Sequence, residues 1–112
     1  MQQTNKKKML TFIETPVFTK LWGDISNDGE LAKLQDELMA DPEAGDVIQG
    51  TGGVRKIRFG AGNKGKRGGS RVIYFNKLSD GTIYLLLTYP KSLIKDLTAE
   101  QKKKLSAWAK EL

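Results

Sequence analysis

VRKIRF (Val54–Phe59), RVIYFN (Arg71–Asn76) and TIYLLLTY (Thr82–Tyr89) decide the fold, because each has the length and the β-branched or aromatic content of a β-strand. The first segment alternates, so its even-numbered residues face one side of a sheet and its odd-numbered residues face the other. The Ser-Asp-Gly sequence at 79–81 predicts a hairpin turn between the second and third segments. The third segment is apolar on both faces, and we therefore expect it inside the sheet, with Pro90 at its end.

Helices are predicted on either side of these strands. Thr15-Pro16 has the form of a helix start, and a second helix should follow and end near Asp41-Pro42. The last helix should begin after Thr98-Ala99-Glu100-Gln101, which has the form of a capping box. Apolar residues recur at helical spacing in these helices and predict their core-facing stripes: Phe18, Leu21, Trp22 and Ile25, then Leu31, Leu34 and Leu38, then Leu105, Trp108, Ala109 and Leu112.

The ends of the chain complete the predicted architecture. A short strand is expected at Met9–Glu14, after a flexible basic tail at residues 1–8. Residues 43–53 are rich in turn formers and separate the second helix from the first long strand. The order strand, helix, helix, three strands, helix predicts a single α+β domain over residues 9–112, with a hairpin-rich and mostly antiparallel sheet.

The composition limits the chemistry that this chain can carry out. Its 112 residues suit one domain, and they include neither cysteine nor histidine. Disulfides, thiolate zinc sites and Ser-His-Asp triads are therefore excluded, and we expect no metal or other cofactor. No apolar run is long enough to span a membrane, so we expect a cytoplasmic protein with no membrane partner.

Positive charge is concentrated in the middle of the chain. The net charge is +6, and residues 47–79 contain no Asp or Glu. The cations of this stretch are Arg55, Lys56, Arg58, Lys64, Lys66, Arg67, Arg71 and Lys77. Such a polarised distribution favours a polyanionic partner, and nucleic acid is the commonest polyanion in a cell.

The glycine-rich loop at 60–69 matches parts of two nucleotide-binding motifs but fits neither. Gly60–Gly65 matches G-x-G-x-x-G, and Gly60–Lys66 matches the first seven positions of a P-loop. However, Arg67 stands where a P-loop has Ser or Thr, and a strand follows the loop instead of a helix. The candidates for holding a nucleic-acid phosphate backbone are Arg55, Lys64, Lys66 and Arg67. The alternative is a solvated basic loop without a ligand.

Three cations of the predicted strands can form a phosphate clamp. Lys56 and Arg58 lie two residues apart and share one strand face, and Arg71 opens the next strand opposite them. Opposed like charges destabilise a sheet unless an anion lies between them or the face is fully exposed to solvent. The three cations can therefore form either an anion clamp or an ordinary solvent-exposed face. Tyr89 and Lys91, at the end of the third segment, would either add a stacking ring and a further cation or be ordinary core and surface residues.

Three stretches of the sequence resemble one known family. GDVIQGTGGVRKIR (Gly45–Arg58), GKRGGSRVIY (Gly65–Tyr74) and YPK (Tyr89–Lys91), together with the element order, resemble the HigB branch of the RelE toxin superfamily over residues 9–112. The resemblance implies the toxin of a type II toxin–antitoxin pair. Members of that family cleave mRNA in the decoding site of the ribosome, and an antitoxin encoded by a neighbouring gene silences them.

The resemblance also implies roles for individual residues. Lys56 and Arg58 match the two basic positions of the first strand, and Arg71 matches the Arg that begins the next strand. The chain departs from the family pattern in three ways. Ser92 follows Lys91 where many relatives have Arg, the last helix contains no Tyr, and the chain has no His. The resemblance therefore does not identify the general base.

Metal-independent RNA cleavage uses the 2′-OH of the substrate as the nucleophile. Arginines suit stabilisation of the phosphorane, because they stay charged and form paired hydrogen bonds with phosphate oxygens. Lys56, close to Arg58 and Arg71, is the candidate general base, because neighbouring cations disfavour its charged form. Tyr89 is a candidate for stacking on a base or for proton transfer.

Two other classes of function would use the same basic face. One is a non-catalytic RNA-binding module, and the other is an interaction domain that docks an acidic protein. If the chain is a toxin, its antitoxin would either cover the clamp with acidic side chains or bind the early helices. We favour the helices, because Trp22 and their amphipathic surface offer apolar area.

Overall fold

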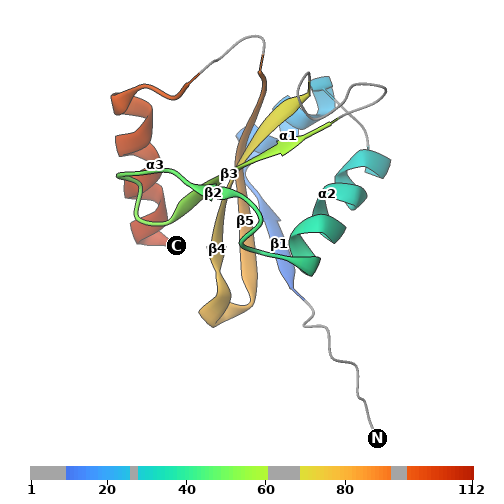
Figure 1. Cartoon of the computed structure of the whole chain (residues 1–112), viewed down its shortest axis with the longest axis horizontal. Coiled ribbons are helices and arrows are strands. Elements are labelled where there is room, and N and C mark those ends of the chain that lie inside the picture. Colours follow the sequence, from blue (N-terminus) through green and yellow to red (C-terminus); the bar gives the residue numbers. More distant parts are fainter. Residues whose placement is uncertain (1–9, 26–27, 61–68, 92–95) are drawn as a thin grey trace, which may run out of the picture.

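The computed structural model describes residues 10–25, 28–60, 69–91 and 96–112 (Figure 1). The predicted tail at 1–8, Ser92 and most of the predicted basic loop lie outside these ranges. Within the described ranges the chain forms three α-helices and one five-stranded sheet, which is the α+β fold that the sequence predicts. No helix in these ranges is long and apolar enough to cross a membrane.

The sheet is mostly antiparallel and has the strand order β1-β5-β4-β3-β2. Its strands are β1 (Thr11–Glu14), β2 (Asp46–Val47), β3 (Val54–Phe59), β4 (Ser70–Lys77) and β5 (Thr82–Pro90). β1 runs parallel to β5, and the other neighbouring strands are antiparallel. β5 has a neighbour on each side, which confirms its predicted interior position. The 3₁₀ turn η2 (Leu78–Asp80) and Gly81, with φ of 65°, form the predicted connection between β4 and β5.

The turn-rich segment at 43–53 contains a strand, β2, that the sequence did not predict. Asp46 pairs with Lys56, and Val47 pairs with Arg55. Two residues are too few to show the alternation by which a strand is recognised. Gly45 allows the chain to come this close to β3, because a Cβ atom there would lie 2.8 Å from the carbonyl oxygen of Lys56.

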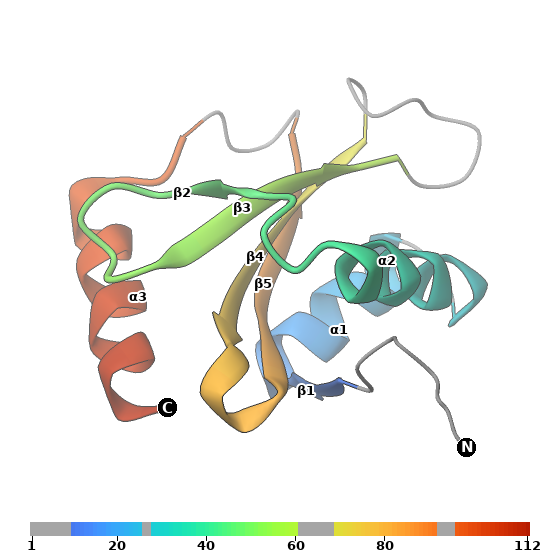
Figure 2. The same cartoon turned by 60° about the horizontal axis from the view of Figure 1, so that its bottom comes forward.

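Helices cover both faces of the sheet, as the turned view in Figure 2 shows. They are α1 (Pro16–Ile25), α2 (Asp28–Ala40) and α3 (Ala99–Glu111). Two predicted caps are confirmed: the amide of Phe18 donates to the Thr15 hydroxyl over 3.0 Å, and Thr98 and Gln101 form a capping box. The Thr15 hydroxyl also donates to the carbonyl oxygen of Leu86 over 2.8 Å, which fixes the start of α1 to β5.

Two hydrophobic cores result, one on each face of the sheet. α1 and α2 cover the first core, whose buried residues include Phe18, Trp22, Leu34, Leu38, Ile57, Phe59, Val72 and Tyr74. α3 covers the second core, whose buried residues include Val54, Ile73, Leu86, Tyr89, Leu97, Leu105 and Ala109. The alternation predicted for β3 is therefore confirmed, because Val54 and Ile57 lie in different cores.

The two tryptophans have different environments. Trp22 is buried, as predicted, and stacks on Phe18 with 5.6 Å between the ring centroids. The prediction of Trp108 as a core residue is wrong, because 42% of its surface is exposed. Leu105 and Ala109 face the sheet from α3, and Trp108 lies at the flank of the same stripe. Among the helices of the described residues, α3 alone covers this face of the sheet, and neither α1 nor α2 buries that flank.

Candidate functional site

Predicted cations meet on the face of the sheet that α3 covers. Arg58 on β3 pairs directly with Arg71 on β4, and Arg71 pairs in turn with Tyr89 on β5. Lys56 lies two residues before Arg58 and faces the same side. The predicted position of Arg71 opposite the first strand's cations is confirmed, with Arg58 as its direct neighbour. The Arg58–Arg71–Tyr89 row thus crosses three strands at one end of the sheet.

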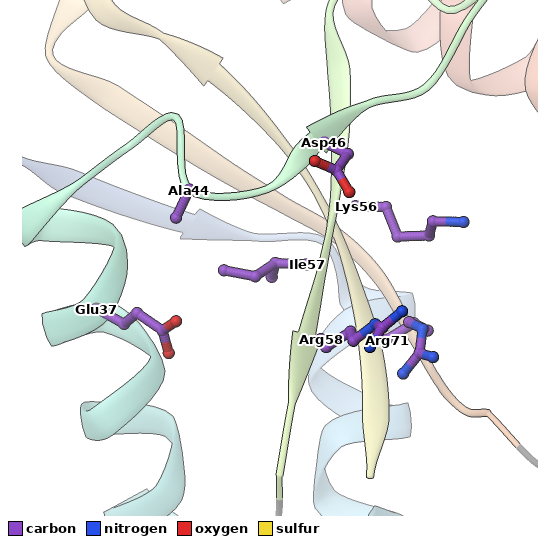
Figure 3. Close-up of a pocket in the computed structure, with 7 residues that line it drawn as sticks. All are labelled: Glu37, Ala44, Asp46, Lys56, Ile57, Arg58 and Arg71. Atoms are coloured by element: carbon purple, nitrogen blue, oxygen red, sulfur yellow. The ribbon is translucent and has the colours of Figure 1, made fainter. Parts of the chain in front are cut away.

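A basic cleft of about 410 Å³ opens beside this row (Figure 3). Lys56, Arg58 and Arg71 line it, and Figure 3 shows the side chains of Arg58 and Arg71 on the same side of β3. Asp46 on β2 lines the same cleft at the edge of the sheet, and Glu37 on α2 lines it from the other side of β3 (Figure 3). The cleft therefore combines three cations with two carboxylates.

Two buried polar groups of the row lack a hydrogen-bond partner within the described residues. Arg71 is 7% exposed with Nη1 unpaired, and Tyr89 is 4% exposed with its hydroxyl unpaired. A buried donor without a partner costs about 1–3 kcal/mol, and more if it is charged. A phosphate oxygen would satisfy such donors and would offset the repulsion between Arg58 and Arg71. The row therefore has the properties of an anion-binding site.

The environment of Tyr89 keeps its phenol protonated. Burial raises the pKa of Tyr89 above its ordinary value, the guanidinium of Arg71 lowers this pKa, and the carboxylate of Asp96 raises it. The net shift is upward, so the hydroxyl can donate a hydrogen bond at neutral pH. The ring itself packs in the core under α3, and this leaves no free face for the base stacking that we considered from the sequence.

An ion pair joins Lys56 to a residue that the sequence analysis did not single out. The Nζ atom of Lys56 lies 4.0 Å from a carboxylate oxygen of Asp96, which precedes α3. A carboxylate at this distance attracts the ammonium group of Lys56 and competes with a phosphate for it. Asp96 is therefore a further charged neighbour of the predicted clamp.

Carboxylates lie in or beside the basic cleft although residues 47–79 contain none. Asp46 on β2 and Glu37 on α2 line the cleft, and Asp96, from the segment before α3, lies beside it at Lys56. Each lies outside the acid-free stretch at 47–79, so that stretch does not fold into an acid-free surface. Among the described residues, no group of three or more Asp or Glu side chains is placed to hold a metal ion.

Other predicted site residues lie away from the basic cleft. Arg55 faces the first core, where its Nη1 donates to the carbonyl oxygens of Glu43 and Gly45 over 3.2 and 2.7 Å. It therefore holds the segment before β2 in place. Lys91 is exposed beyond the end of β5, and its amide donates to the carbonyl oxygen of Gly69 over 3.2 Å. Three further candidates lie outside the described residues: Lys64, Lys66 and Arg67.

The fold is similar to those of solved RelE structures. A free Escherichia coli RelE toxin with two arginine-to-alanine substitutions has a TM-score of 0.59 and 12% identity, over 85% of this chain and 95% of that chain. An archaeal RelE–RelB complex from Pyrococcus horikoshii OT3 has a TM-score of 0.51 and 22% identity, over 76% of this chain and 98% of that chain. No protein-family model matches the chain. The likeness establishes a RelE-like fold.

Proposed function

We propose that this protein is the toxin of a type II toxin–antitoxin pair and a metal-independent endoribonuclease that cleaves mRNA on the ribosome. The Arg58–Arg71–Tyr89 row carries the proposal, because Arg71 and Tyr89 each bury a donor that has no partner within the described residues. The RelE-like fold supports it further. We place the chain in the HigB branch on the sequence of Gly45–Arg58 and Gly65–Tyr74.

The proposed reaction is a transesterification within the RNA. The 2′-oxygen attacks the adjacent phosphorus, and the bond between phosphorus and the 5′-oxygen breaks. The products are a 2′,3′-cyclic phosphate and a 5′-hydroxyl end. Arg58 and Arg71 stabilise the negative charge that develops on the phosphorane oxygens, and Arg71 is the better placed of the two because it is buried.

Two protons must move in this reaction, and we name a candidate for each transfer, one in the cleft and one in the Arg58–Arg71–Tyr89 row beside it. Lys56 is our candidate for the base that removes the 2′ proton, in competition with its ion pair to Asp96. Tyr89 is our candidate for the acid that protonates the leaving 5′-oxygen, because its pKa is raised and it keeps its proton. Further cations would hold the RNA or ribosomal backbone: Lys64, Lys66, Arg67 and Lys91.

Induced expression in growing cells tests the proposal. Translation should stop, and mapping of RNA 5′ ends should show new cuts inside translated reading frames. Purified protein should cut the same mRNA much faster on translating ribosomes than free in solution, because the ribosome aligns the substrate. Equal cutting of free and translated mRNA would contradict the ribosome dependence.

The alternative is a non-catalytic RNA-binding module, which would use the three cations of the basic cleft to bind phosphate. Under this alternative the protein binds RNA or ribosomes, and it produces no new 5′ ends in free mRNA or in mRNA on translating ribosomes. The third class, a domain that docks an acidic protein, predicts neither RNA binding nor cleavage.

We further propose an antitoxin encoded by a neighbouring gene as the protein partner. The archaeal RelE neighbour was solved as a complex with RelB, which supports a partner of this kind. Our expectation that Trp22 offers apolar area to the antitoxin is wrong, because Trp22 is buried against Phe18 and Phe59. The exposed apolar residues near the start of α1 are Ile13 and Val17, and these take the place of Trp22 in the proposal.

A further inference from the structure

A second cleft, of about 260 Å³, lies between β2 and the start of α3. Lys56 and Asp46 line both this cleft and the basic cleft, so the two spaces share a wall. One sugar links the base and the phosphate of a nucleotide. A nucleotide with its phosphate at the Arg58–Arg71–Tyr89 row can therefore place its base in the second cleft.

One wall of the second cleft is aliphatic. Val47 on β2 is 52% exposed, and Ile48 and Leu97 extend the wall from the core under α3. A flat aromatic ring that lies on such a wall is removed from water on one side. The space is smaller than the roughly 300–1,000 Å³ of a pocket for a drug-sized ligand, so it suits a single base.

The rim of the second cleft carries carboxylates where a polyanion site would be expected to exclude them. Asp46 and Asp96 line it together with two lysines, Lys56 and Lys102. Carboxylates next to a bound phosphate repel it, and this cost needs a compensating contact. A base supplies that contact when its N–H groups donate to the carboxylate oxygens, because hydrogen bonds to charged acceptors are strong.

Lys56 connects Asp96 to the phosphate end of the site. Its Nζ atom lies 4.0 Å from a carboxylate oxygen of Asp96, and Lys56 lines the basic cleft together with Arg58 and Arg71. Asp96 is thus within electrostatic reach of the row while it lines the second cleft. The two clefts behave as neighbouring parts of one nucleotide site.

We propose that the second cleft binds the nucleobase next to the scissile phosphate, and that Asp46 and Asp96 select bases that carry an exocyclic amino group. This inference rests on the proposed RNA cleavage and names what sets its sequence preference. Cytosine and adenine present amino N–H donors to a carboxylate. Guanine also carries an amino group, whereas uracil presents a carbonyl oxygen at position 4 that a carboxylate repels.

Cytidine and uridine 3′-monophosphates are matched probes, since the amino group at position 4 and the ring proton next to it distinguish their bases. We expect wild-type protein to bind the cytidine nucleotide about tenfold more tightly in NMR titrations. The phosphate contacts are common to both probes and cancel in the ratio. In the Asp46→Asn, Asp96→Asn double variant the ratio should fall to about one, because an asparagine amide can donate to the uracil oxygen.

Asp36→Asn is the matched control, because Asp36 is an exposed carboxylate on α2 that lines neither cleft. It should leave the nucleotide ratio at the wild-type value. Spectra of each variant show directly that it is folded. A wild-type ratio near one, or a ratio that the double variant does not change, would overturn the base pocket.

Cleavage maps separate the failure of this inference from failure of the proposed function. Wild-type cuts should be depleted in uracil at one position beside the cut, and the double variant should lose that depletion in its remaining cuts. Cleavage with no base preference at any flanking position refutes the base pocket but still supports the proposed endoribonuclease activity. A cytidine preference in the titration without any cleavage supports the pocket and refutes the nuclease.

Discussion

Replacement of Arg71 with alanine tests the proposed anion site most directly. Arg71 is 7% exposed, lies opposite Arg58 and keeps Nη1 without a partner within the described residues. If this nitrogen binds the phosphorane, its removal deletes a charged donor from a buried site, and the rate of cleavage should fall about 10²–10³-fold. Arg71→Lys restores the charge without the paired donors, so it should recover only part of the rate.

The same substitution should change the free energy of unfolding very little. Loss of the guanidinium relieves an unpaired buried donor, which is worth about 1–3 kcal/mol, and it removes the repulsion from Arg58. Loss of the aliphatic stem removes packing and leaves a cavity, a cost of about 2–3 kcal/mol. Because these effects oppose each other, we expect a net change within about 1 kcal/mol.

Two measurements on the same protein preparations decide the matter. Urea denaturation gives the free energy of unfolding, and single-turnover cleavage on programmed ribosomes gives the rate. Arg55→Ala is the matched control, because Arg55 lies on the other face of β3 and binds the carbonyl oxygens of Glu43 and Gly45. It should lower stability by about 1 kcal/mol and affect the rate far less. Folded Arg71→Ala protein that cleaves within about threefold of wild type would refute our placement of the active site.

Lys56→Arg keeps the charge but cannot accept a proton, so it should bind ribosomes without cleaving mRNA; cleavage at the normal rate would make Lys56 purely electrostatic. Tyr89→Phe should slow cleavage. Because the folded-state pKa of Tyr89 lies above its ordinary value of 10.0, wild-type stability is lost as pH rises past that value, and Tyr89→Phe should lessen this loss in denaturation experiments. An antitoxin bound through Ile13 and Val17 should keep its affinity at high salt in calorimetry. A steep loss of affinity with salt would instead indicate that acidic side chains of the antitoxin cover the basic cleft.

Most elements of the fold were predictable because each combines a periodic pattern with a local boundary signal. The cap at Thr15 and the capping box at Thr98 each depend on a few consecutive residues of the sequence, and the structure contains both. β2 was not predictable, because a strand of two residues has no period. The parallel pairing of β1 with β5 joins Thr11 to Thr82, and no local signal in either strand specifies a partner so far along the chain.

The candidate site was predictable only where it depends on the alternation of side chains between the two faces of a strand. The shared face of Lys56 and Arg58 follows from their spacing, and the hairpin places Arg71 beside them. Asp96 lies far from Lys56 in sequence, and the path of the chain into α3 brings the two together. Burial of the Tyr89 ring likewise depends on the packing of α3 against the sheet, which no residue near position 89 reveals.

The charges of the cleft give a physical reason for the proposed dependence on the ribosome. Arg58 and Arg71 oppose each other, and an anion relieves their repulsion. The carboxylates of Asp46 and Asp96 partly offset the positive charge of the free cleft, so a phosphate gains less there than it would from cations alone. Free RNA should therefore bind weakly, and a substrate that the ribosome already holds in place loses less entropy when it enters the site. An RNA whose base satisfies both carboxylates recovers part of the lost affinity, which would link sequence preference to cleavage rate.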